Sequence, residues 1–120
     1  FREEKDMETG LQKLQELKER AKNVGVKGDR RYNPGWHLCR DLRNMLICSE
    51  AITISALHRK ESRGAHTRLD FPNKEETPWA HVNTSIFQKD GTMVYEHTPK
   101  PEMPAELKEL FAKKPEAAKA

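Results

Sequence analysis

The feature that most constrains the fold is a predicted helix from about Trp36 to Lys60, whose apolar character changes along its length. Its first half carries a single apolar stripe, formed by Leu38, Leu42, Met45 and Leu46. From Ile47 to Leu57 the stretch is apolar nearly all round. A one-sided stripe needs one neighbour, whereas a helix that is apolar all round must be covered on several sides. The sequence therefore predicts that this helix belongs to a larger body than the chain itself provides.

Another amphipathic helix precedes it, from about Glu3 to Asn23. Its apolar residues recur at spacings of three or four, as one packed face requires; they are Met7, Leu11, Leu14, Leu17 and Ala21. Further along, two β-prone runs flank Asp90-Gly91, and an Asp-Gly pair in this setting is a strong hairpin signal. Pro104 suits the first turn of a short helix that follows it.

These elements predict a mainly α fold, a small spectrin-repeat-like helical bundle with a short C-terminal β-hairpin appendage. We expect one domain over residues 1–111 and a disordered tail over 112–120, because the tail holds only Ala, Lys, Glu and Pro. The predicted elements are helices at about 3–23 and 36–60, a hairpin at about 79–98 and a short helix at 105–111.

Composition limits the classes of partner. The 22 basic and 19 acidic residues leave a net charge of only +3, so the chain as a whole has no strong field for a polyanion and nucleic acid is not expected. No apolar run approaches the roughly 20 residues of a membrane span. The start of the sequence also lacks the layout of a signal peptide. Any membrane association is therefore expected only indirectly, through partner subunits.

The cysteine, histidine and glycine spacings predict no metal or cofactor site. Cys39 and Cys48 lie nine residues apart on one predicted helix, about 13 Å along its axis, which is too far for a disulfide. We interpret them as reduced, buried thiols in a cytosol-like compartment. No set of Cys and His residues has zinc-ligand spacing, and Gly25 and Gly28 do not follow a strand as a dinucleotide fingerprint would.

The loop after the long helix is dense in charge, from Lys60 to Pro72, reading Lys-Glu-Ser-Arg-Gly-Ala-His-Thr-Arg-Leu-Asp-Phe-Pro. A basic patch for nucleic acid is one interpretation, but two acidic residues interrupt it. A second is that positive charge gathers where the helix dipole favours it and Gly64 reverses the chain. The interpretation that we favour is a network of charge-assisted hydrogen bonds that pins the loop to a neighbouring domain. Its candidate members are Arg59, Glu61, Arg63, His66, Arg68 and Asp70. Direct catalysis by Arg63 or His66 is a further option, although we assign no catalytic residue.

The run from Arg59 to Pro72, followed by Trp79 and a short hairpin, closely resembles the C-terminal domain of succinate dehydrogenase and fumarate reductase flavoproteins. The resemblance covers about residues 2–111. It implies a small helical domain with a β appendage, packed beside the FAD-binding domain of the same subunit. The whole subunit would hold FAD, interconvert succinate and fumarate by hydride transfer, and contact an iron-sulfur subunit. The location implied is cytoplasmic, at the inner face of the cell membrane through partner subunits.

The parts of that family that carry its chemistry have no counterpart in this sequence. Its Gly-rich FAD fingerprint, its flavin-linking His and its substrate-binding His and Arg motifs lie in N-terminal regions, so Arg63 is not the family's catalytic arginine. We therefore expect an excised domain or C-terminal fragment that binds no FAD by itself and is noncatalytic. Two alternatives stay open, the same domain of L-aspartate oxidase and an independent helical interaction module. Trp79 and the segment Pro99 to Pro104 favour the dicarboxylate enzymes over the first.

Overall fold

The structure is a computed structural model that describes residues 1–112. Its elements are, in chain order, α1 (Glu4–Ala21), α2 (Pro34–His58), β1 (Val82–Lys89), β2 (Thr92–Pro99) and α3 (Ala105–Ala112). The predicted mainly α fold with a C-terminal hairpin is confirmed. The tail predicted over residues 112–120 lies outside the described residues, except for Ala112, which ends α3.

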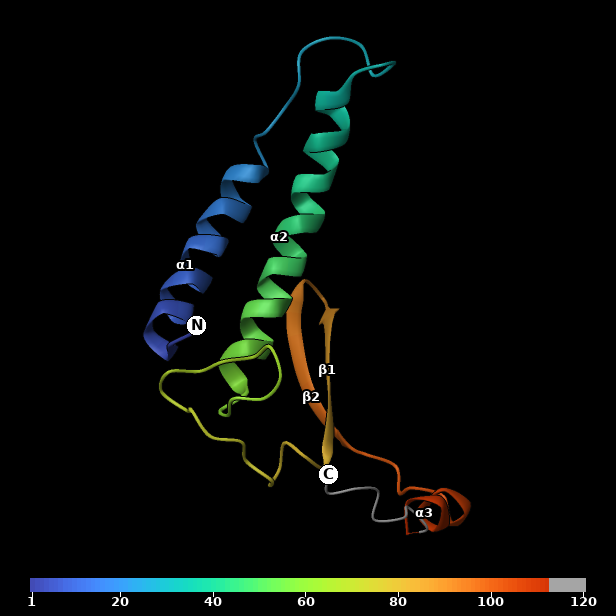
Figure 1. Cartoon of the computed structure of the whole chain (residues 1–120). Coiled ribbons are helices and arrows are strands. Elements are labelled where there is room, and N and C mark those ends of the chain that lie inside the picture. The colour runs from blue at the N-terminus through green and yellow to red at the C-terminus, as the bar shows by residue number, and fades with distance from the viewer. Residues whose placement is uncertain (113–120) are drawn as a thin grey trace, which may run out of the picture.

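Helices α1 and α2 lie side by side and run in opposite directions, joined by a connection at one end of the molecule (Figure 1). Few apolar residues are buried between and around them; these are Met7, Ala21, Leu46 and Ala56. Glu50 of α2 is also buried, and its carboxylate accepts hydrogen bonds from Gln15 and Lys18 of α1. A buried charge is tolerated only when it is paired. The hydrogen bonds from Gln15 and Lys18 therefore stabilise the Glu50 carboxylate and link α1 to α2 inside a small core.

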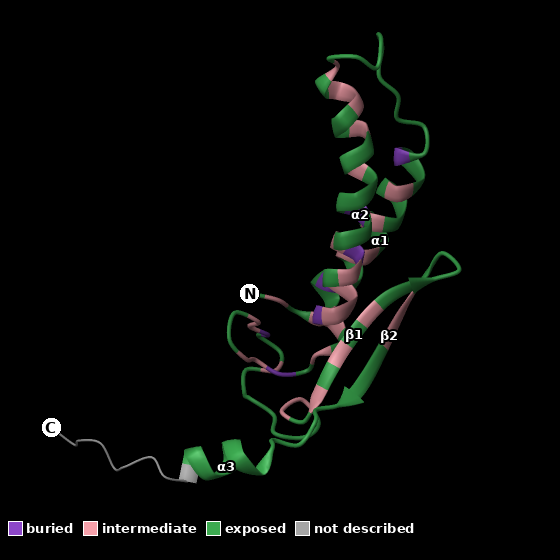
Figure 2. Cartoon of the chain, turned by 90° about the vertical axis from the view of Figure 1, so that its right-hand side faces the viewer, coloured by how far each residue is buried: buried purple, intermediate pink, exposed green. Residues whose placement is uncertain are grey.

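One face of α2 is left uncovered in this chain. Leu38, Met45 and Ile52 follow one another at intervals of seven residues, and 68%, 64% and 64% of their surfaces are exposed. Cys48 lies on the same face and is exposed, while Cys39 is half-buried, so the prediction of two buried thiols is wrong. The reason is that α1 covers a single side of α2, as Figure 2 shows.

Strands β1 and β2 form a two-stranded antiparallel hairpin beside the second half of α2. The turn between them has φ angles of 50° at Asp90 and 82° at Gly91, which the Asp-Gly pair is suited to adopt. The ring of Tyr95 stacks on that of His58, with centroids 4.2 Å apart. This contact attaches the hairpin to the end of α2, next to the charged loop.

Within residues 1–112 no helix has the length and apolar character needed to cross a membrane. The same residues contain no group of three or more His, Cys, Asp or Glu side chains placed to hold a metal ion.

Candidate functional site

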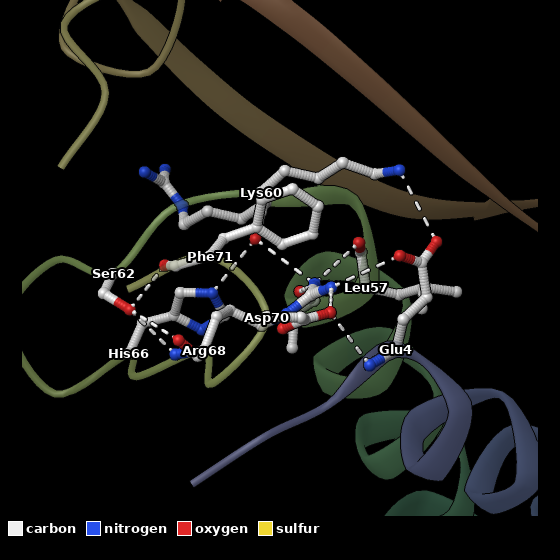
Figure 3. Close-up of polar contacts among 10 residues, drawn as sticks. Glu4, Leu57, Lys60, Ser62, His66, Arg68, Asp70 and Phe71 are labelled. Carbon is white, nitrogen blue, oxygen red and sulfur yellow. Dashed lines mark hydrogen bonds and ion pairs between the residues drawn. The ribbon is translucent and has the colours of Figure 1, made fainter. Parts of the chain in front are cut away.

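The charged loop folds back on the molecule, and we call residues 59–75 the base loop. It lies against the C-terminal end of α2 and the start of α1 (Figure 3). The backbone N–H of Arg2 donates to Thr67 O at 3.1 Å, and that of Leu69 donates to Arg2 O at 2.9 Å. The N-terminal segment therefore pairs with the base loop, and two parts of the chain that are far apart in sequence form one unit with the end of α2.

Arg68 is at the centre of this unit, and its side chain has no solvent exposure. Its Nη1 donates to the carbonyl oxygens of Ala56 at 3.0 Å and Leu57 at 3.1 Å. These carbonyls belong to the last turn of α2, where backbone acceptors lack partners within the helix. Positive charge is also favoured there by the helix dipole. Arg68 therefore caps the C-terminal end of α2.

Asp70 holds the other edge of the Arg68 guanidinium. Nε and Nη2 of Arg68 donate to the two carboxylate oxygens at 2.7 and 2.6 Å, a bidentate pair. Asp70 Oδ2 also accepts the backbone N–H of Glu4 at 3.1 Å, where α1 begins without a side-chain cap from Glu3. The pair thus connects the negative end of α2 to the positive end of α1.

The electrostatic effect of this pair is mutual. The hydrogen bonds from Arg68 hold the pKa of Asp70 well below its usual range. The hydrogen bonds to Asp70 in turn raise the pKa of Arg68. Both groups therefore stay ionised across the physiological pH range.

Glu61 forms a second buried centre in the base loop, also without solvent exposure. Arg63 Nε donates to both of its carboxylate oxygens at 3.1 Å, the backbone N–H of Glu75 donates at 3.0 Å, and Arg59 donates through Nη1. Burial by itself raises the pKa of Glu61, but these hydrogen bonds outweigh burial, and the net pKa lies below the ordinary value of 4.5. Glu61 is therefore an ionised carboxylate that accepts hydrogen bonds from two arginines, Arg59 and Arg63.

His66 closes a tight turn in the loop. The backbones of Arg63 and His66 exchange hydrogen bonds of 2.9 and 3.1 Å around Gly64, whose φ of 61° suits a residue without a side chain. The ring Nε2 lies 3.2 Å from Arg59 O. Burial lowers the pKa of His66 below its ordinary 6.5, and the charges of Arg2, Arg59 and Arg68 lower it further, so the ring is neutral at pH 7.

Three contributors to the site were not identified from the sequence. The hydroxyl of Ser62 accepts the Arg68 N–H at 2.9 Å and lies 2.8 Å from Phe71 O. The Phe71 ring covers the Arg68 guanidinium, with Cζ 4.9 Å from the ring centroid. Glu4 supplies the N–H that Asp70 caps. Ser62 and Phe71 lie inside the charged run, where their types suit a turn and a stacking partner, but no local signal points to Glu4.

The structure brings all six predicted site residues together, in two clusters on one loop. Arg59, Glu61 and Arg63 form one cluster, and Arg68 with Asp70 forms the other, with His66 between them. The hydrogen bonds described above run within this chain and stabilise the packing of the loop on two helix ends. That the network contacts a neighbouring domain stays a prediction.

Comparison with known proteins gives a consistent set of similarities. Residues 1–115 match the family described as fumarate reductase flavoprotein C-term. The chain is 34% identical over 96 residues to the succinate dehydrogenase flavoprotein subunit of Coxiella burnetii, a match that covers 79% of this chain and 16% of that subunit. It is 44% identical over 80 residues to the fumarate reductase flavoprotein subunit of Helicobacter pylori, covering 66% of this chain and 11% of that protein.

Among solved structures, the chain is similar to Mycobacterium smegmatis Sdh1 in complex with UQ1. The TM-score is 0.78 at 39% identity, and the match covers 92% of this chain and 19% of that one. The chain therefore spans less than a fifth of the length of each of these three relatives.

Proposed function

Because the chain belongs to the fumarate reductase flavoprotein C-term family, we propose that it is the noncatalytic C-terminal domain of a succinate dehydrogenase or fumarate reductase flavoprotein subunit. Residues 1–111 make up the domain. The intact subunit holds FAD in its other parts and interconverts succinate and fumarate there. The observation that carries the proposal is the match of almost the whole chain to a family defined by this end of the flavoprotein.

The chemistry of the base loop supports a structural role. Glu61 and Asp70, the two carboxylates that bind arginines in the loop, have lowered pKa values, so neither is a proton donor near neutral pH. Arg68 makes its hydrogen bonds to Asp70 and to α2 carbonyls, and no part of it is exposed. Groups held in this way stabilise a fold more readily than they act on a substrate.

The charged residues of the base loop differ in burial, and this difference separates residues that support the loop from residues that can contact a partner. Glu61 and Arg68 are wholly buried, whereas Arg59 and Arg63 keep 26% and 35% of their side chains exposed. Arg59 and Arg63 are the residues that contact the FAD-binding domain, and the buried charges hold them in place. The second partner is the iron-sulfur subunit of the complex, and the assembly lies at the inner face of the cell membrane through its other subunits.

A comparison of this chain with the complete product of its gene tests the proposal. Each would be supplied with FAD, succinate and a dye acceptor, and dye reduction would be followed. We expect turnover by the complete product and none by the 120-residue chain. Turnover by the chain alone would contradict the noncatalytic assignment, and a complete product that neither binds FAD nor oxidises succinate would contradict the family activity.

The Arg63→Ala variant of the complete product tests the role of the loop. It should lower thermal stability or subunit assembly more than it lowers the rate of the chemical step, because Arg63 holds Glu61 and the carbonyl of Glu75. Lys74→Ala removes an exposed charge from the same loop and is the matched control. Normal stability and assembly with a collapsed turnover would make the loop catalytic.

A further inference from the structure

The end of the molecule opposite the base loop carries a concentration of positive charge. We call residues 20–43, around the connection between α1 and α2, the helical tip. It holds seven basic and two acidic residues, a net charge of +5, so the rest of the chain carries −2. Five of the seven are arginines, and all five are exposed; they are Arg20, Arg30, Arg31, Arg40 and Arg43. The charge of the whole chain conceals this asymmetry.

The guanidinium groups of the helical tip have no carboxylate partner among the residues that the structure describes. Within residues 1–112, the five side chains form no ion pair or hydrogen bond, unlike Arg59, Arg63 and Arg68 in the base loop. A guanidinium carries five N–H donors in a planar fork that matches a carboxylate. The helical tip therefore offers a set of unused donors that suits an anionic group.

Trp36 packs against two of these arginines. The Cζ atom of Arg30 lies 4.8 Å from the centroid of the indole, and that of Arg40 lies 5.9 Å from it. Together with Arg43, these residues line a surface hollow of about 370 Å³. Stacking on an aromatic ring holds a guanidinium by its face and leaves its N–H edge available. The hollow is thus lined by guanidinium N–H donors, two sets of which are positioned by packing on Trp36.

Tyr32 adds an aromatic contact at the edge of the helical tip. Its side chain is fully exposed, and its φ of 55° is one that residues with side chains rarely adopt. Leu38, one helical turn into α2, is also 68% exposed. Arginine and aromatic residues are the types enriched in the centres of protein interfaces, where they contribute most of the binding energy.

We propose that the helical tip docks an acidic segment of a second polypeptide in the assembly. Carboxylates of that segment pair with Arg30, Arg40 and Arg43 around Trp36, and Tyr32 makes an apolar contact beside them. The inference rests on the proposed role of the domain in subunit assembly. The molecule is 66 Å long; α3 lies at the end opposite the tip, and the N-terminus lies at the end of the α1–α2 pair that is remote from the tip (Figure 1). The tip therefore projects away from both described chain ends, which favours a separate polypeptide as its occupant.

Nucleic acid and anionic lipid are weaker candidates for the same charges. Arg30 and Arg40 pack on a single indole at a short tip, whereas proteins that bind single strands use a long basic groove with a series of aromatic platforms. Arginine rather than lysine predominates at the tip, and lysine is depleted from protein interfaces. Both rivals are outcomes of the experiment below.

The test uses the complete product of the gene, tagged and isolated with its partners. The tip variant carries Arg30→Gln, Arg40→Gln and Arg43→Gln. The control carries Lys13→Gln, Lys74→Gln and Lys89→Gln, which make the same change in charge at exposed positions away from the tip. Mass spectrometry should show at least a fivefold loss of one co-purifying subunit from the tip variant and none from the control. Bound FAD and dye-linked succinate oxidation, measured on the same samples, should equal those of the wild type.

A photo-crosslinker in place of Tyr32 identifies what the tip contacts. We expect Tyr32→p-benzoylphenylalanine to cross-link, within the purified assembly, to that same subunit at a segment rich in Asp and Glu. Unchanged co-purification of the tip variant would overturn the inference, as would a cross-link to a segment without carboxylates or to nucleic acid or lipid. Such a result would leave the proposed function intact if FAD and succinate oxidation were normal. Loss of those two properties in the wild-type product would instead contradict the proposed function.

Discussion

The two ends of α2 use arginine in different ways. Four of the nine arginines lie at or beside the base loop, and the remaining five lie in the helical tip. At the base loop, the Arg68 side chain is buried and donates hydrogen bonds to the Asp70 carboxylate and to carbonyls of α2. At the tip, Arg30, Arg40 and Arg43 are exposed, and they line a hollow beside the Trp36 indole, on which Arg30 and Arg40 pack.

Desolvation explains why the two ends differ. A guanidinium removed from water must recover its hydrogen bonds from the protein, and removing one partner of such a buried pair is strongly destabilising. A guanidinium on the surface keeps its water and contributes little to folding. The arginines of the base loop therefore stabilise the fold of this chain, while the guanidinium N–H groups of the helical tip are available to bind another molecule. The number of arginines alone does not distinguish these roles.

The largest effect should come from Arg68→Gln. It leaves Asp70 without its partner and removes the donor to the carbonyls of Ala56 and Leu57, so the free energy of unfolding should fall by about 3–5 kcal/mol. Urea unfolding followed by circular dichroism measures this change. Arg68→Lys, which keeps the charge and loses the fork, should be intermediate and gives a graded result if the glutamine variant does not fold. An equal loss of stability for Arg40→Gln would show that an exposed arginine of the helical tip supports the fold as much as the buried Arg68.

Glu61→Gln should have the next largest effect. The glutamine keeps the shape of the side chain but leaves Arg59 and Arg63 without a carboxylate in a buried position, at a cost of about 1.5–3 kcal/mol. The same urea experiment checks this value. Glu96→Gln on the exposed side of β2 removes the same charge and should leave the urea midpoint unchanged.

Mild acidification should destabilise the base loop before Glu61 and Asp70 titrate. His66 has a folded pKa below its ordinary 6.5, so the unfolded chain binds more protons between the two values, and stability falls as pH drops through that window. His66→Gln should make the melting temperature less dependent on pH between 7 and 5. The exposed His81→Gln is the control. An unchanged slope for His66→Gln would show that the ring is not held neutral by the loop.

Further acidification should remove the contribution of the carboxylates. Glu61 and Asp70 have lowered folded pKa values, so their contribution is present above their ordinary values of 4.5 and 3.8 and is lost as pH falls through the lower, folded values. The expected result is a second loss of stability below about pH 4.5 that is smaller in Glu61→Gln, which retains only the contribution of Asp70.

The smallest effect should come from the tip variant with Arg30→Gln, Arg40→Gln and Arg43→Gln. Surface substitutions without a buried partner seldom change stability, so the urea midpoint of this chain should match that of the wild type. A clear fall in the midpoint would mean that these arginines support the fold and are not reserved for a partner.

Local sequence patterns were sufficient for much of the fold. The spacing of apolar residues in α1 and the Asp90-Gly91 pair each reflect short-range geometry, a helical face in one case and positive φ angles in the other. The exposed position of Cys48 was not predictable in this way. It depends on which side of α2 is covered, and that is decided by the placement of α1.

The site was predictable in membership but not in arrangement. The density of charge identified the six predicted site residues in the base loop, because such a charged run seldom occurs in a solvated loop. Complete burial of Glu61 and Arg68 was not evident, since charged residues are almost never fully buried unless paired. The N–H of Glu4 that Asp70 caps is 66 residues distant in sequence, and no local pattern encodes that contact. That the tip arginines have no carboxylate partner within residues 1–112 likewise depends on where each of those carboxylates lies.

The side-chain Nε–H signals of the arginines, observed by NMR on a ¹⁵N-arginine-labelled sample of this chain, would show whether the guanidinium groups at the two ends of α2 differ in hydrogen bonding. Arg63 and Arg68 donate their Nε–H groups to carboxylates, whereas the five tip arginines have no such acceptor among the described residues. We predict slow exchange with water for Arg63 and Arg68, and exchange at least tenfold faster for Arg20, Arg30, Arg31, Arg40 and Arg43. Equal exchange rates at the two ends of α2 would contradict the account.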